Sequence, residues 1–121
     1  MNGAPEGELF EVTVLPREDL GPGSSESMRD ELANVVVPAL TAQSDVAWNV
    51  VFDALTALRR ILVYHPDVVT STAIESLVPG IEKSIRALRS VLAKNAIYCA
   101  EDLFLKCSAE LNLTQESVYV L

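Results

Sequence analysis

Apolar residues recur at intervals of three and four positions along most of the chain beyond residue 27, which is the spacing of one face of an α-helix. The first such run predicts a helix from Ser27 to Ala42. Pro38 lies inside this run. Because proline has no amide hydrogen and clashes with the preceding turn, the helix should kink or end there.

The clearest apolar stripe predicts a second helix. The stripe comprises Trp48, Val51, Phe52, Leu55, Leu58 and Leu62. Ser44 or Asp45 is the expected N-cap. The helix should end at His65-Pro66-Asp67, because the residue before a proline is pushed out of helical geometry.

Further helical segments follow. The spacing from Val68 to Leu88 continues in phase across Pro79-Gly80, which predicts one kinked helix. A fourth helix is expected from Val91 to about Ser108, and Thr114 is a candidate cap for a short fifth one. The positions expected to face inward on the fourth helix are Leu92, Ala96, Cys99, Leu103 and Cys107.

Residues 1–26 have a different composition, with several glycines and prolines and a serine pair. Such a segment buries too little apolar surface to order itself, so we expect a flexible leader. Residues 27–121 form the second unit, an all-α array of stacked antiparallel hairpins, that is, an α-solenoid. About two repeats are fewer than such arrays need, so we expect the array to be incomplete.

Charge narrows the class of partner. The formal net charge is −8, and the acids gather in residues 1–58, whereas residues 59–106 carry a small excess of bases. A strongly acidic chain is a poor general nucleic-acid binder. A basic edge can still attract an acidic protein at short range, because salt screens the distant acids.

Candidate chemistry is sparse. Cys99 and Cys107 are eight residues apart on one predicted helix, too far for a disulfide, and His65 is the single histidine. Asp67 and Ser71 beside His65 form a weak hydrolytic triad candidate, because neighbours in one loop rarely have the required geometry. We therefore expect no enzyme activity, no cofactor and no metal site. The chain also has no apolar run of membrane length.

A family resemblance rests on Trp48 at a helix start, on Leu88-Arg89-Ser90-Val91, and on the later residues Lys94, Ala96 and Asp102-Leu103-Phe104. On these residues the segment from Trp48 to Lys106 resembles the TOG domains of the CLASP and crescerin type, which are built from HEAT repeats. The resemblance implies an α-solenoid of HEAT-like hairpins that binds tubulin or microtubules through the turns along one edge. It departs from the family at Val51, where many TOG domains have arginine.

By this resemblance the partner-binding residues are Trp48, Arg89, Ser90 and Lys94. Trp48 also fits a core position, since it is in phase with Phe52. Arg89 and Lys94 could instead pair with acids of the array such as Asp102. The adjacent Arg59-Arg60 fits a solvated helix face better than a ligand clamp.

The sequence thus favours a non-catalytic scaffold in the cytoplasm, at the cytoskeleton or in the cilium, with tubulin as its partner. The alternative is a generic helical adaptor, or a repeat fragment that requires self-association or further repeats and has no affinity for tubulin.

Overall fold

The computed structural model describes residues 12–120 of the chain, and the side chains of residues 12–110. Within this range the regular structure is helical and no strand occurs, so the predicted all-α class is confirmed. The elements are η1 (Arg17–Asp19), α2 (Ser25–Glu31), the π-helical turn η2 (Leu32–Val36), α3 (Val37–Leu40), α4 (Trp48–Tyr64), η3 (Pro66–Val68), α5 (Ser71–Ile85) and α6 (Ser90–Val120).

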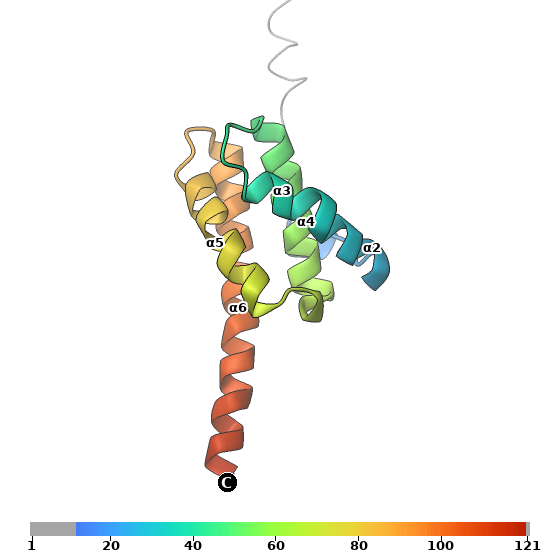
Figure 1. The fold of residues 1–121 in the computed structure, drawn as a ribbon, viewed down its shortest axis with the longest axis vertical. Coiled ribbons are helices and arrows are strands. Elements are labelled where there is room, and N and C mark those ends of the chain that lie inside the picture. Colours follow the sequence, from blue (N-terminus) through green and yellow to red (C-terminus); the bar gives the residue numbers. More distant parts are fainter. Residues whose placement is uncertain (1–11, 121) are drawn as a thin grey trace, which may run out of the picture.

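Helix α6 packs against both of the other long helices, α4 and α5. It lies beside α4 and runs in the same direction, while α5 packs against α6 in the opposite direction (Figure 1). Helix α3 contacts both α4 and α5. In the predicted array the second and third helices would pair directly as one hairpin. This pairing is wrong, because α4 and α5 both pack mainly against α6 and hardly against each other.

The core lies where α3, α4, α5 and α6 meet. Most of the predicted stripe of α4 is buried, whereas Trp48 and Val51 are half-buried. The largest fully buried apolar side chains contributed by α4, α5 and η2 are Leu55, Leu58, Ile61, Leu77 and Val36.

Proline is accommodated in two ways. A π-helical turn precedes Pro38, and the chain stays helical from Ser25 to Leu40. This π-helical turn is wider than an α-helical turn, so it leaves room for the proline ring. It also relaxes the hydrogen-bond pattern at the position where Pro38 has no amide hydrogen to donate. Helix α5 continues through Pro79 without interruption. Its neighbour Gly80 touches α3 so closely that a Cβ atom there would overlap the carbonyl of Leu40.

Two predicted caps are wrong. Helix α4 begins at Trp48 with Ala47 as its N-cap and has no side-chain cap, so neither Ser44 nor Asp45 has this role. Helix α6 runs without a break past Thr114, so no fifth helix starts there. The predicted end of α4 before Pro66 is confirmed.

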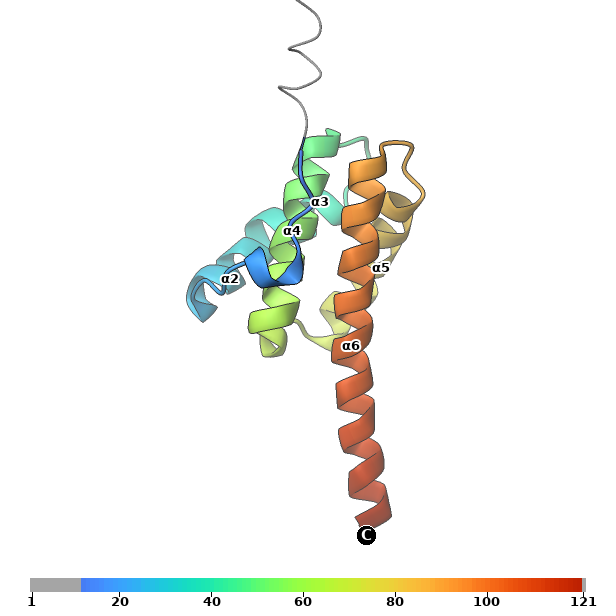
Figure 2. The ribbon, with the colours of Figure 1, turned by 180° about the vertical axis from the view of Figure 1, so that it is seen from behind.

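Part of the predicted leader is packed on the helices. Residues 1–11 lie outside the described part, but residues 12–20 run along α4 on the face opposite to α3 (Figure 2). Leu20 is buried, and the Arg60 Nε donates to its carbonyl at 2.7 Å. The structure thus differs from the flexible leader over residues 12–26, because apolar and polar contacts fix this stretch.

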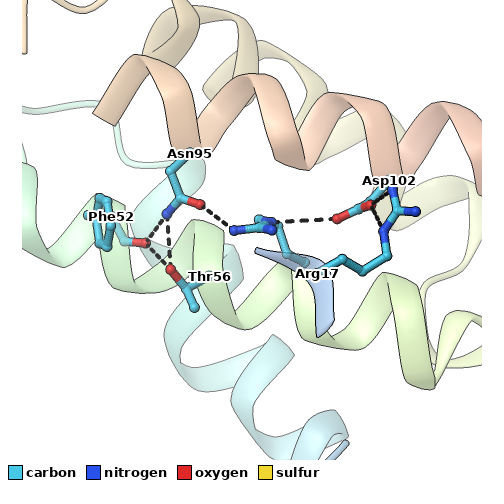
Figure 3. A network of polar contacts seen from close by, with 6 residues as sticks. Arg17, Phe52, Thr56, Asn95 and Asp102 are labelled. Atoms are coloured by element: carbon cyan, nitrogen blue, oxygen red, sulfur yellow. Dashed lines mark hydrogen bonds and ion pairs between the residues drawn. The ribbon is translucent and has the colours of Figure 1, made fainter. Parts of the chain in front are cut away.

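A buried polar network joins α4 to α6. Arg59 is 1% exposed and donates from Nη1 to the Asn95 Oδ1 at 3.0 Å. The Asn95 amide donates in turn to the Phe52 carbonyl and to the Thr56 hydroxyl, as Figure 3 shows. The expectation that Arg59 lies on a solvated face is wrong, since its guanidinium crosses the helix interface.

The same network holds the N-terminal coil. Asp102 is 3% exposed and accepts from Arg17 at 2.6 and 3.0 Å, while its second oxygen faces the Arg59 Nε at 3.5 Å. The Arg59 guanidinium also lies over the Tyr98 ring, 5.0 Å from its centroid. Asp102 therefore pairs with Arg17 and Arg59, not with Arg89 or Lys94.

We predict that Asp102→Ala destabilises the fold by about 3–5 kcal/mol, because it leaves the buried Arg59 charge without its carboxylate. Urea denaturation measures this free energy. The matched control is Glu101→Ala on the neighbouring exposed position, expected to change stability by about 0.5 kcal/mol or less. Equal effects of the two substitutions would contradict the role of the network.

The two cysteines should differ in reactivity. Both are free thiols, and Cys107 is exposed, contrary to its predicted inward position. Cys99 is buried, and this burial raises the pKa of its thiol far above the usual range, with the Asp102 carboxylate adding to the shift. Since the thiolate is the nucleophile, iodoacetamide should alkylate Cys107 and leave Cys99 intact until the protein is denatured. Mass spectrometry of peptides distinguishes them, and similar native rates at both would refute the packing described for α6.

Candidate functional site

The parallel course of α4 and α6 brings their first residues to the same end of the molecule (Figure 1). Trp48 is the first residue of α4, and Ser90 is the first residue of α6. The carbonyl of Arg89 accepts from the amide of Ala93 at 3.1 Å, so Arg89 holds the N-cap position of α6. The two predicted turns are therefore neighbours in space.

Trp48 and Arg89 are in direct contact. The guanidinium carbon of Arg89 lies 4.1 Å from the centroid of the indole ring. The Trp48 ring packs edge-on against Phe52, with centroids 6.2 Å apart and planes at 81°. A cation over an indole at an exposed site contributes about 0.5–1 kcal/mol. The tryptophan is thus anchored in the core on one side and covered by an arginine on the other.

Leu88 adds an apolar side chain beside this pair. It was expected to face the core at the end of the third helix, but α5 ends at Ile85 and Leu88 is 104% exposed in the following loop. Arg89 and Ser90 are also exposed. We refer to Trp48, Leu88, Arg89 and Ser90 as the rim.

Lys94 lies apart from the rim. It is exposed on α6, and its ammonium is 5.7 Å from the centroid of the Tyr98 ring. Tyr98 borders a shallow pocket formed with Pro16 and Arg17, on the side covered by the N-terminal coil. Among the described residues no salt bridge or cation–π contact places Lys94 on Trp48, and its ring contact is with Tyr98. The structure therefore brings together three of the four predicted residues.

A pocket opens directly beside the rim. Its volume is about 500 Å³, and it lies between the segment of residues 39–48, the end of α5 and the start of α6. Its apolar lining includes Leu40, Trp48, Val51, Leu88 and Leu92. The close approach of Gly80 to α3 places it in the wall as well. The periodicity of apolar residues could not reveal this pocket, because it depends on how two connections, α3–α4 and α5–α6, fold at one end of the helices.

Two bases line the same pocket. Lys83 and Arg86 are exposed, and neither is in a salt bridge with another described residue. Asp45 is the acid in the lining. With Arg89 at the rim, this end of the molecule presents three bases around a mainly apolar hollow.

The other residues considered as candidates for chemistry have structural roles or environments that the contacts explain. The Nε2 of His65 lies 2.7 Å from the Pro22 carbonyl, and its Nδ1 lies 3.3 Å from the hydroxyl of Ser25. These contacts bind α2 and its preceding loop to the end of α4. Glu101 is exposed while Asp102 is buried, as expected for helix neighbours that point in different directions. Among residues 12–110, whose side chains the structure describes, no group of histidines, cysteines and acids could hold a metal ion.

The helices of the described part include none that is both long and apolar enough to cross a lipid bilayer. The chain was also compared with known proteins. No protein-family model matches it, and neither the curated proteins nor the solved structures give a match.

Proposed function

We propose that this chain is a non-catalytic interaction scaffold of HEAT-like helices that binds tubulin through the rim. The observation that carries the proposal is the contact between Trp48 and Arg89 at 4.1 Å, which joins two turns far apart in sequence. The TOG resemblance had placed both residues on one partner-binding edge. If either side chain were buried, or if the two lay on opposite sides of the molecule, the structure would argue against this edge.

The composition of the rim suits protein recognition. Tryptophan and arginine are the residues most enriched among those that dominate binding energy at protein interfaces. A half-buried indole and a fully exposed leucine offer apolar area, and Arg89 offers charge. With Lys83 and Arg86 nearby, the rim fits an acidic surface, and tubulin is the acidic partner that the TOG resemblance suggests.

The order of the helices also supports a repeat architecture. In an α-solenoid, equivalent helices of consecutive repeats lie side by side and parallel, as α4 and α6 do. In this proposal α4 and α6 open consecutive repeats, and the rim is formed by their first residues. The weak direct contact of α4 with α5 is a departure from a regular hairpin.

A second candidate is a helical adaptor that associates with itself. The observation in its favour is the apolar surface of α6, where Ile97, Phe104 and Leu105 are 44%, 69% and 51% exposed. A solenoid would cover such a surface with its next helix, and a second copy could cover it equally well. Light scattering distinguishes the candidates, because a dimer without affinity for tubulin supports the adaptor.

We predict that Arg89→Glu abolishes co-elution with tubulin on size exclusion, since it replaces the stacked cation of the rim with a negative charge. Binding should weaken at least about tenfold. The matched control is Arg29→Glu, which makes the same charge change at an exposed position of α2. Co-elution that persists in Arg89→Glu, or that is lost equally in the control, would refute the proposed edge.

A further inference from the structure

We infer that the pocket beside the rim binds a short acidic peptide segment by taking up one large apolar side chain of that segment. This inference rests on the proposed role of the rim as an interaction surface, but it does not require tubulin to be the partner. It assigns a chemical class to the ligand: an apolar anchor residue flanked by carboxylates.

The size and lining of the pocket fit an apolar anchor. A volume of about 500 Å³ is within the range of about 300–1,000 Å³ that is usual for ligand pockets. Leu40, Val51 and Leu92 make the walls apolar, and Trp48 adds an aromatic face. An aromatic side chain that enters such a site removes about 150–250 Å² of surface from water, the main favourable contribution of an anchor residue.

The charges around the pocket specify the flanking residues. Lys83 and Arg86 line the pocket, and Arg89 lies over Trp48, which also lines it. None of these bases is in a salt bridge among the described residues, and Asp45 is the acid that lines the pocket with them. The balance is positive, so carboxylates beside the anchor would be attracted and basic residues repelled.

The shape of the apolar surface favours a peptide over a small molecule. The surface continues out of the pocket onto Leu88, whose side chain is fully exposed. A small anion would leave this surface uncovered, whereas an extended chain can bury its anchor and still cover Leu88. The three bases Lys83, Arg86 and Arg89 follow one another at intervals of three residues from the end of α5 to the start of α6, so they can meet several carboxylates of one chain.

Peptide binding can be measured by the fluorescence of Trp48. It is the single tryptophan of the chain and lines the pocket, so its emission reports on occupancy. The probe is a synthetic peptide with one phenylalanine flanked on each side by two glutamates. We expect a saturable change in emission with this peptide. Replacing its phenylalanine with alanine, or its glutamates with lysines, should weaken binding at least about tenfold, since the first removes the anchor and the second reverses the charge.

Variants of the protein provide the complementary test. Lys83→Glu and Arg86→Glu should each weaken peptide binding about three- to tenfold, and Leu88→Ser should weaken it without altering the fold, because all three side chains are exposed. Arg29→Glu is the control of equal charge change and should bind as the unmodified protein does. Circular dichroism verifies that each variant is folded.

The inference is overturned if the emission does not change with the peptide, or if the alanine peptide binds as well as the phenylalanine one. It is also overturned if light scattering shows that a second copy covers the pocket and excludes the peptide. The outcome is separable from that for tubulin. Tubulin co-elution without peptide binding removes only the pocket, and peptide binding without co-elution removes only tubulin.

Discussion

The arrangement of the helices depends on one buried cation. Arg59 sits between α4 and α6 with almost no contact with water, and a charge in that position is costly unless it is paired and hydrogen-bonded. Asn95 supplies a hydrogen bond to Nη1 and Asp102 supplies the opposite charge, although the Nε of Arg59 makes no hydrogen bond to a described residue. If α6 slid along α4 or rotated, the guanidinium would lose these two partners. This register is what places the first turn of α6 against the first turn of α4.

Asp102 extends the constraint to a third segment. It also binds Arg17, whose coil lies on the face of α4 opposite to α3. One carboxylate therefore fixes a helix and a non-helical stretch together. Figure 3 shows this polar network between α4 and α6. The exposed side chains of the rim, Leu88, Arg89 and Ser90, take no part in it, so substitutions of these three residues should leave the fold intact.

Much of the helical fold could be predicted from the sequence, and the exceptions have physical causes. The stripe of α4 was found because most of its members are apolar and in phase. Arg59 was misassigned by its charge, although it lies four residues after Leu55 and three before Leu62, and Asn95 similarly lies among the inward positions of α6. Polar residues in phase with an apolar stripe are the signal that could have revealed the network.

The candidate site was predictable only in part. The sequence indicated Trp48 and Arg89, but not that they touch, because this depends on the register of α4 against α6. Leu88 was assigned to the core because the apolar phase continues past Ile85, where the helix in fact ends. Thr114 was taken as a cap because threonine is a common N-cap residue, yet no glycine or proline interrupts the chain between Ser90 and Val120.

The stacking of Arg89 on Trp48 has a further consequence for association. A free arginine side chain loses much rotational freedom when it is fixed in a complex, and this loss opposes binding. The guanidinium already lies over the indole, 4.1 Å from its centroid, and the indole packs against Phe52, so part of that ordering takes place during folding. A partner that binds this surface meets an arginine side chain that is already oriented, so binding costs less side-chain entropy. This saving strengthens the complex beyond what electrostatic attraction alone provides.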